Sequence, residues 1–458
     1  MQQNKADLGT APVGKLLFRL AVPTVVAQLI NMLYNIVDRI YIGHIPEVGS
    51  LALTGVGVCM PLIMIVSAFA ALAGAGGAPR ASIFMGKGQN ENAEKTLAGC
   101  FSLLCIVAVA LTVVLLTCSR DLLLAFGASS NTIGYAADYM KIYAIGTIFV
   151  QLTLGMNAFI TAQGFAKQGM LSVLIGAVCN IALDPLFIFG FGMGVKGAAL
   201  ATILSQAASC AWVLLFLTGK TTILKLKLAN LNLKPSVVLP CVALGMASFI
   251  MQSTESVISV CFNSSLLKYG GDMAVGAMTI LTSVMQFAML PMTGLGQGAQ
   301  PIISFNFGAR NADRVKQAYR LLLMVSLSYS MLIWGAIMLV PRAFAGIFTP
   351  DAQLLDFTAK ALRIYCGGLG IFGIQIACQM ALVSLGNALC SMIVAIMRKF
   401  VLLLPLIYLM PTLVADKTMG VYMAEPVADV LAVSFTAVLF YFVFRKSMKK
   451  LETPKAGE

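Results

Sequence analysis

Five acidic residues stand in long apolar stretches of this chain: Asp38, Asp184, Glu255, Glu425 and Asp429. A charged side chain at the centre of a membrane helix costs ~2.5–3.5 kcal/mol on insertion scales, so its default interpretation is functional. Asp184 is the most informative, because Asn180 precedes it by four residues and both project from one helix face. Carboxylate and amide oxygens suit a hard cation. The pair predicts a binding site for a cation or a proton.

Neighbouring apolar runs hold further oxygen ligands for the same site. The amide of Asn157 and the hydroxyl of Thr202 would contribute if their helices pack against the Asp184 helix. Asp38 lies near the end of the first apolar run and supplies a second carboxylate. Its neighbour Arg39 leaves an alternative open, namely an interfacial ion pair.

Within one helical turn of Glu255, the residues Thr254, Ser256 and Ser259 offer hydroxyl groups that could compensate its carboxyl group. Two interpretations stand side by side. Glu255 either lines a central cavity and attracts cationic substrates, or it is a protonated carboxyl hydrogen-bonded to those hydroxyls.

A different role is predicted for the last two acids. Glu425 and Asp429 are four residues apart on one helix face, and the basic residues Arg398 and Lys399 lie in the preceding apolar run. These four residues are expected to form a structural charge cluster.

The chain contains an internal repeat, in which a segment of the first half recurs 222 residues later, as from Gly86 to Gly308. A chain made of two copies of a multi-span unit is typical of a transporter. The positions equivalent to Asp38, Asn180 and Asp184 in the second copy are Val260, Leu402 and Leu406. An architectural role would be expected in both copies, so the ion site is predicted in the first copy. The repeated identities are Gly74/Gly296, Gly76/Gly298, Pro79/Pro301, Ser82/Ser304 and Gly86/Gly308.

Composition indicates the elements that must hold these residues. Hydrophobic residues make up 59% and charged residues 11% of the chain, whereas soluble proteins carry about 25% charged residues. Uncharged runs longer than the ~20 residues that cross a bilayer alternate with short charged stretches. We predict an all-α integral membrane protein with twelve transmembrane helices, approximately at 16–41, 51–79, 97–118, 138–160, 169–190, 196–217, 237–262, 273–300, 318–340, 358–383, 389–413 and 420–444.

The repeat divides the chain into two pseudo-symmetric six-helix lobes, 1–219 and 236–458, joined by a linker at 220–235. Apolar residues and lysines alternate in the linker, which predicts that it lies along the inner membrane surface. Pro23 lies in the first predicted helix and is expected to act as a hinge there, because proline removes a helix hydrogen bond.

The net charge of +13 is a signal of topology. Most of the 31 Lys and Arg residues fall in loops on the same side as the two termini, which the positive-inside rule places in the cytoplasm. Nucleic-acid binding is not expected, because the chain has no domain free of membrane spans. The eleven cysteines form no Cys-x-x-Cys pair, and the one histidine, His44, is in a predicted outer loop. We therefore expect neither an enzyme nor a cofactor.

The whole chain resembles the multidrug and toxic compound extrusion (MATE) family, in particular its MepA-like bacterial branch. The resemblance is carried by the order and spacing of short segments. They are Leu20-Ala-Val-Pro23-Thr, Asn35-Ile-Val-Asp38-Arg39-Ile-Tyr-Ile-Gly43, Asn180-Ile-Ala-Leu-Asp184-Pro185, Met85-Gly86-Lys-Gly-Gln-Asn, Asn306-Phe-Gly308-Ala-Arg-Asn and Gly420-Val-Tyr-Met-Ala-Glu425-Pro426.

This resemblance implies a plasma-membrane antiporter, which exports amphipathic organic cations as Na⁺ or H⁺ enters. It implies a first-lobe cation site on Asp38, Asn180, Asp184 and Thr202 with Asn157 nearby, and places a seventh-span acid on Glu255. Another branch also uses an acid in the tenth span, but the run from Ile364 to Ser384 has none here. This departure favours the first-lobe site.

Substrate recognition is only weakly encoded in the sequence. Besides Glu255, the candidates for the substrate cavity or a linked proton site are Tyr34, Gln286 and Met289. The expected partners are organic cations and the lipid bilayer, and the protein is expected to work as a monomer. The alternative is a flippase of lipid-linked saccharides or lipids in the same wider superfamily. Such a flippase usually needs a cationic cavity, for which Arg398 and Lys399 are the only deep intramembrane cations identified.

Overall fold

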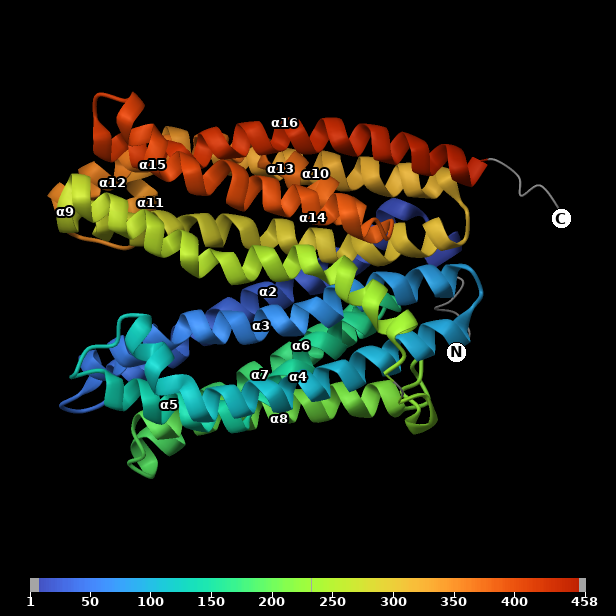
Figure 1. Ribbon diagram of the computed structural model, residues 1–458, viewed down its shortest axis with the longest axis horizontal. Coiled ribbons are helices and arrows are strands. Elements are labelled where there is room, and N and C mark those ends of the chain that lie inside the picture. The colour runs from blue at the N-terminus through green and yellow to red at the C-terminus, as the bar shows by residue number, and fades with distance from the viewer. Residues whose placement is uncertain (1–7, 232, 453–458) are drawn as a thin grey trace.

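A computed structural model describes residues 8–231 and 233–452. The first half of the chain forms one lobe, the lower one in Figure 1. The bent pair α5 and α6 meets at an angle of 59°. The elements of this lobe are α2 (Val13–Gly43), α3 (Gly49–Gly86), α4 (Asn90–Ala125), α5 (Ile133–Ile145), α6 (Thr147–Ala162), α7 (Ala166–Pro185), the π-helical turn η1 (Leu186–Gly190) and α8 (Val195–Thr218).

The second half forms the upper lobe of Figure 1. Its longest element, α9, is broken at Gly271, where φ is 63°, and its two arms lie side by side. The elements are α9 (Pro235–Gly308), α10 (Ala312–Leu339), α11 (Pro341–Gly346), α12 (Ala352–Tyr365), the 3₁₀ turn η3 (Cys366–Gly368), α13 (Leu369–Ser384), α14 (Ala388–Ile396), the π-helical segment η4 (Met397–Leu403), α15 (Leu404–Leu413) and α16 (Lys417–Glu452).

These helices account for twelve membrane spans. Within the described residues, 10 helices are long and apolar enough to cross a membrane, or 11 with the bent pair α5 and α6 as one span. Counting the two arms of α9 separately brings the number to twelve, because 74 residues of helix greatly exceed the ~30 Å of a bilayer core. The predicted fold class is confirmed, and the protein is a multi-pass membrane protein.

The two lobes repeat each other in geometry as well as in sequence. The Ser82 hydroxyl donates to the Ala162 carbonyl, and Ser304, the equivalent residue, donates to the equivalent carbonyl of Ser384. The turns that follow these carbonyls contain Gly164 and Gly386, with φ of 90° and 73°. Glycine is the residue that adopts this left-handed conformation without steric cost. Equivalent positions thus play equivalent structural roles, even where their side chains differ.

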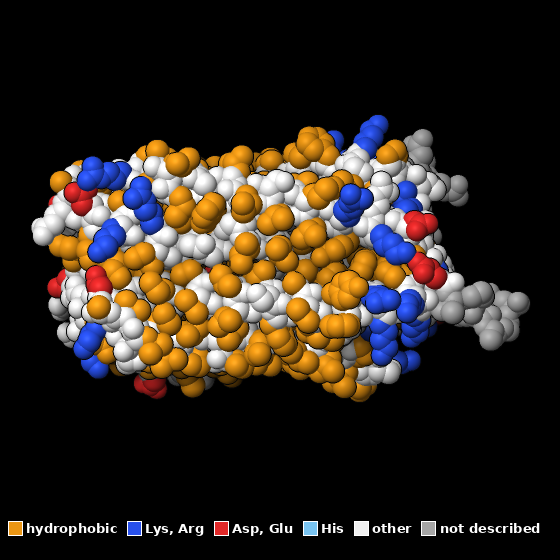
Figure 2. Space-filling model, turned by 90° about the horizontal axis from the view of Figure 1, so that it is seen from above, with side chains coloured by type: hydrophobic (Ala, Val, Ile, Leu, Met, Phe, Trp, Pro, Cys, Tyr) orange, Lys and Arg blue, Asp and Glu red, His pale blue; other side chains and the backbone are white. Residues whose placement is uncertain are grey.

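The surface matches a membrane environment. Figure 2 shows apolar side chains over the middle of one face, with Lys and Arg near its two ends. Both ends of the described chain lie at the same end of the molecule, where Arg310 donates to the carbonyls of Lys450 and Leu451, and Asn306 donates to the carbonyl of Leu8. We call this end the terminal end.

The lobes are sealed against each other in the half of the molecule next to the terminal end. A Cβ atom at Gly86 would overlap the Phe305 carbonyl oxygen, and one at Gly308 would overlap the Ile83 carbonyl oxygen. Gly86 and Gly308 are equivalent in the repeat, and so are Ile83 and Phe305. The contact is therefore symmetric, and it needs glycine because the backbones of α3 and α9 touch.

α2 takes part in this seal beside Pro23. The Thr24 hydroxyl donates to the Gly294 carbonyl of the second lobe at 2.6 Å, and Gln28 donates to Gln297 at 3.1 Å. α2 remains one helix through Pro23. Pro23 thus lies where the first helix is attached to the opposite lobe.

The linker packs on the first lobe. Gln163 accepts hydrogen bonds from the backbone N–H groups of Ile223 and Leu224, and Leu224 is fully buried in the first-lobe core. Lys227 forms an ion pair with Glu94 of α4. Ile223, Leu224 and Leu226 of the alternating pattern therefore pack on the first-lobe core. The position of the linker along the inner membrane surface stays a prediction.

Candidate functional site

Asn180 and Asp184 lie on the buried side of α7, with 1% and 0% exposure. The Asn180 side-chain amide donates to Asp184 Oδ1 at 3.3 Å, as their spacing of one helical turn predicts. The carboxylate thus keeps its second oxygen, Oδ2, for another partner.

Asp38 on α2 brings a second carboxyl group to this place. Its side chain interacts directly with that of Asp184, so α2 and α7 join the two acids inside the first lobe. Arg39 instead has an exposed side chain, at the wall of a surface pocket with His44. Asp38 thus interacts with Asp184 inside the lobe, and the charge of Arg39 also acts on it, so the acid pair and the interfacial ion pair both stay predictions.

Three buried oxygens of this group have no hydrogen-bond donor: Asp38 Oδ1, Asn180 Oδ1 and Asp184 Oδ2. Unpaired buried acceptors cost ~1–3 kcal/mol each, so an arrangement that gathers several of them needs a reason. Oxygens of carboxylates and amides are the ligands of hard cations. We call Asp38, Asn180 and Asp184 the first-lobe acid cluster.

Two tyrosines and two polar residues of α8 surround this cluster. Tyr34, one turn before Asp38, interacts with Asp38, Asp184 and Gln206. Tyr139 of α5 interacts with Thr202 and Asp38. The structure therefore places Tyr34 beside the acid cluster. Thr202 interacts with Tyr139, and its hydroxyl donates to the Ala198 carbonyl, so its role as an ion ligand stays a prediction.

Sequence reasoning missed Tyr139 and Gln206. Gln206 follows Thr202 by four residues, so the spacing that paired Asn180 with Asp184 could have found it. Its Oε1 atom is another buried oxygen without a donor. Tyr139 had no comparable signal, because its position depends on how α5 packs against α2 and α8.

Asn157 lies away from the cluster. Its amide donates to the Gly169 carbonyl at 3.3 Å, near the beginning of α7. Asn180 follows Gly169 on the same helix by about three turns, roughly 16 Å along the axis. This geometry corrects the expectation that Asn157 contributes an oxygen to the site.

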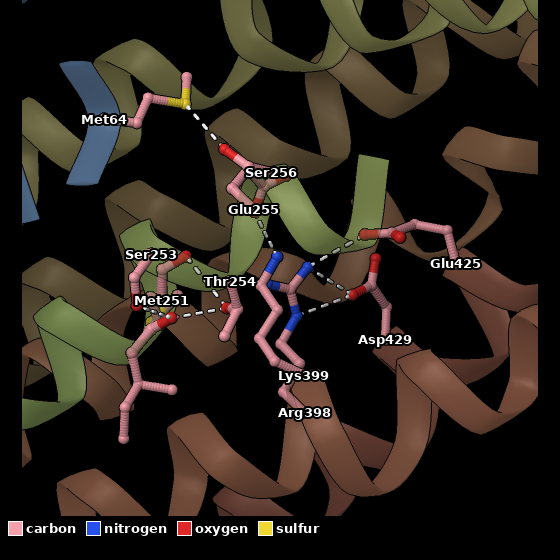
Figure 3. Close-up of polar contacts among 11 residues, drawn as sticks. Met64, Met251, Ser253, Thr254, Glu255, Ser256, Arg398, Lys399, Glu425 and Asp429 are labelled. Atoms are coloured by element: carbon pink, nitrogen blue, oxygen red, sulfur yellow. Dashed lines mark hydrogen bonds and ion pairs between the residues drawn. The ribbon is translucent and has the colours of Figure 1, made fainter. Parts of the chain in front are cut away.

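The second lobe contains a separate group of five charges, shown in Figure 3. The guanidinium of Arg398 is ion-paired with Glu425 at 3.2 Å and with Asp429 at 3.0 Å, and all three side chains are buried. Arg398 also stacks over the Phe372 ring at 4.6 Å. We call Arg398, Glu425, Asp429, Lys399 and Glu255 the second-lobe charge cluster.

Lys399 does not bond to the same acids as its neighbour. Its ammonium donates to Glu255 on the first arm of α9 at 2.6 Å. The nearby hydroxyls serve other acceptors, since Thr254 donates to the Ile250 carbonyl and Ser256 approaches the sulfur of Met64. Glu255 is thus ion-paired, which corrects the alternative of a protonated carboxyl held by those hydroxyls.

The remaining cavity candidates, both on the second arm of α9, differ in environment. Gln286 is exposed. Met289 is partly buried and packs against the core of the second lobe. Their connection with substrate stays a prediction.

We expect Arg398→Met to destabilise the protein strongly, because Glu425 and Asp429 would keep buried charges without their guanidinium. Removing one partner of a buried ion pair typically costs about 3–5 kcal/mol. The melting temperature in detergent should fall by several degrees. Lys95→Met, which removes an exposed ion pair with Glu91, is the matched control and should change little. An unchanged melting temperature for Arg398→Met would contradict the structural role of the cluster.

Comparisons with known proteins agree with this architecture. The MatE family model matches residues 23–186 and 247–409, one stretch in each lobe. The multidrug export protein MepA of Staphylococcus aureus (strain NCTC 8325 / PS 47) is 24% identical over 437 residues, 95% of each chain. The MepA protein of Staphylococcus saprophyticus is 24% identical over 400 residues, 87% of each chain.

Solved structures show the same fold. A MATE protein in the bent conformation has a TM-score of 0.91 at 22% identity, covering 98% of this chain and 99% of that one. An outward-facing multidrug resistance MATE family transporter of the MOP superfamily has a TM-score of 0.89 at 22% identity, with 97% and 98% covered. Since the family model matches both lobes and most of the residues, this chain belongs to the MatE family.

Proposed function

We propose that the protein is an efflux antiporter of the plasma membrane, which exports amphipathic organic cations in exchange for Na⁺ or H⁺. The observation that carries the proposal is the first-lobe acid cluster. It gathers two interacting carboxyl groups and three buried oxygens without donors in the interior of a membrane protein. Such a site has a clear use if a cation enters it.

The substrate class is taken from two sources. The relatives named above are multidrug export proteins, and the protein carries acids in both lobes. Exporting one monovalent cation against 100 mV costs ~2.3 kcal/mol, and one entering cation returns the same amount. One-for-one exchange is then driven by the chemical gradient of the coupling ion, ~1.4 kcal/mol per tenfold ratio.

The orientation follows from the basic residues. We place both termini in the cytoplasm on the positive-inside rule. The seal formed by Gly86, Gly308 and Thr24 then closes the cytoplasmic half between the lobes. In this orientation the structure represents a state that is closed towards the cytoplasm.

Coupling requires that ion and substrate favour different states of the protein. α2 connects the two sites, since it carries Asp38 in the acid cluster and Thr24 at the seal with the second lobe. A cation that binds Asp38 and Asp184 acts on the same helix that holds the lobes together. Bending at Pro23, the proposed hinge, would transmit this effect to the seal.

The proposal is tested with the purified protein in liposomes that contain a fluorescent organic cation such as ethidium. A Na⁺ gradient and a pH gradient are imposed separately, and we expect dye movement under one of them. That result would establish exchange and identify the coupling ion. Absence of movement under both gradients would overturn the proposal and favour a lipid-linked substrate.

The alternative of a lipid flippase receives less support from the second lobe. A flippase of lipid-linked saccharides would use cations to hold a diphosphate. Arg398 and Lys399, the two deep cations identified in the sequence, are both ion-paired with acids. They would have to leave these partners before binding an anion.

A further inference from the structure

The second-lobe charge cluster has one acid more than it has bases. Its bases are Arg398 and Lys399, and its acids are Glu255, Glu425 and Asp429. With all five ionised, the net charge is −1. One additional positive charge would therefore balance the cluster, and a monovalent organic cation carries that charge.

Glu255 differs from the other members of the cluster in exposure. Its side chain is 52% exposed, whereas the side chain of its partner Lys399 is only 6% exposed. Glu425 and Asp429 are buried as well, at 7% and 1%. Glu255 is thus the only acid of the five-residue cluster with a carboxylate open to an arriving ligand.

The position of Glu255 is at the boundary between the lobes. The next residue, Ser256, approaches the sulfur of Met64 on α3 of the first lobe, and Figure 3 shows Ser256 between Met64 and Glu255. Phe249, on the same arm of α9, packs edge-to-face against Phe69 of the first lobe with ring centroids 4.9 Å apart. This boundary between the lobes therefore carries methionine and aromatic side chains as well as Glu255, and such side chains suit an amphipathic cation.

Lys399 has acidic neighbours other than Glu255. Its charge also acts on Glu425 and Asp429, and the charge of Glu255 acts on Arg398, so the five groups form one electrostatic network. If Lys399 left Glu255, its ammonium would still lie among acids and would not become an isolated buried charge. Moving it is therefore less costly than breaking an isolated buried pair.

We propose that Lys399 is a movable counter-ion, which covers Glu255 in this state and yields it to the positive charge of the substrate. Lys399 then turns to the buried acids Glu425 and Asp429. With substrate bound, three acids face two basic side chains and one organic cation. Lys399 thereby sets specificity, because a ligand must carry a positive charge to replace the ammonium at Glu255.

The test compares a cation with a neutral molecule of similar shape. Equilibrium dialysis of purified protein measures the binding of tetraphenylphosphonium and of uncharged triphenylphosphine oxide. We expect Glu255→Gln to weaken phosphonium binding about tenfold and Lys399→Gln to strengthen it several-fold, with the neutral ligand unchanged in both. Lys399→Arg, which keeps the charge, is the control and should resemble the wild type.

The double variant Glu255→Gln/Lys399→Gln removes both charges and leaves no unpaired ion. It therefore gives a readable result even if one of the single variants misfolds. It should bind phosphonium as weakly as Glu255→Gln. The proposal fails if the ratio of phosphonium to neutral affinity is unchanged in the double variant. It also fails if Lys399→Gln weakens phosphonium binding as much as Glu255→Gln does.

This inference rests on the proposed export of organic cations, but the two can fail separately. If phosphonium binds through Glu255 while neither gradient drives dye movement, the antiport proposal fails, but the role of Glu255 in binding the cation is retained. If a gradient drives dye movement while the Glu255 variants bind phosphonium normally, only the role of Lys399 and Glu255 is refuted.

Discussion

Asp184→Asn should reduce gradient-driven transport at least tenfold while leaving the protein folded and inserted. The substitution keeps the shape of the side chain but removes the charge that makes the first-lobe acid cluster attractive to a cation. Asp184 is fully buried and interacts with Asp38 and Asn180. The measurement is dye efflux from liposomes under the gradient that drives the wild-type protein.

Asp121→Asn provides the matched control, because Asp121 is an exposed acid at the end of α4 in the same lobe. It should transport at the wild-type rate. Melting temperature and size-exclusion profiles establish that both variants are intact. Transport by Asp184→Asn at the full rate would show that the coupling ion does not bind at this cluster.

Gly86→Val should block the transport cycle by keeping the lobes apart at the terminal end. A side chain at this position would collide with the backbone carbonyl of Phe305, which no rotamer change can relieve. The closed state would be strongly disfavoured, and transport should fall at least tenfold. Gly308→Val, at the equivalent position, should have the same effect, since its side chain would meet the Ile83 carbonyl.

The separation of the lobes can be measured directly. Spin labels at Lys95 and Lys316, exposed residues at the beginnings of α4 and α10, report the distance across the terminal end. We expect this distance to increase in Gly86→Val. Gly57→Val on the same helix is the control, because a Cβ there would have no atom within 4 Å. A normal distance distribution in Gly86→Val would contradict the role of this glycine.

Local sequence patterns were sufficient for the architecture. Twelve apolar runs, a repeat at a constant offset and paired glycines predicted two six-helix lobes, and the structure confirms them. The reason is that membrane insertion depends on the composition of about 20 consecutive residues, which is visible in the sequence. The contact of Asn180 with Asp184 was predictable for a similar reason, since residues one turn apart on a helix always share a face.

Contacts between helices were not predictable in the same way. Asn157 was expected near Asp184, but it bonds to Gly169, about four helical turns from Asp184 on α7. Tyr139 lies near the acid cluster, although nothing in its own segment indicated a site. Gln206 also lies there, and only its four-residue spacing from Thr202 could have indicated it. The rotation and the relative height of each helix decide such contacts, and both depend on packing against several neighbours.

Glu255 illustrates most clearly the difference between features visible in the sequence and contacts set by helix packing. An acid in the seventh span and two basic residues in the eleventh are visible in the amino-acid sequence. The packing of the helices brings Lys399 to Glu255 and Arg398 to Glu425 and Asp429. Adjacent residues of a helix point in different directions, so they meet different neighbours. Which neighbours they meet is set by the packing of helices that are far apart in the chain.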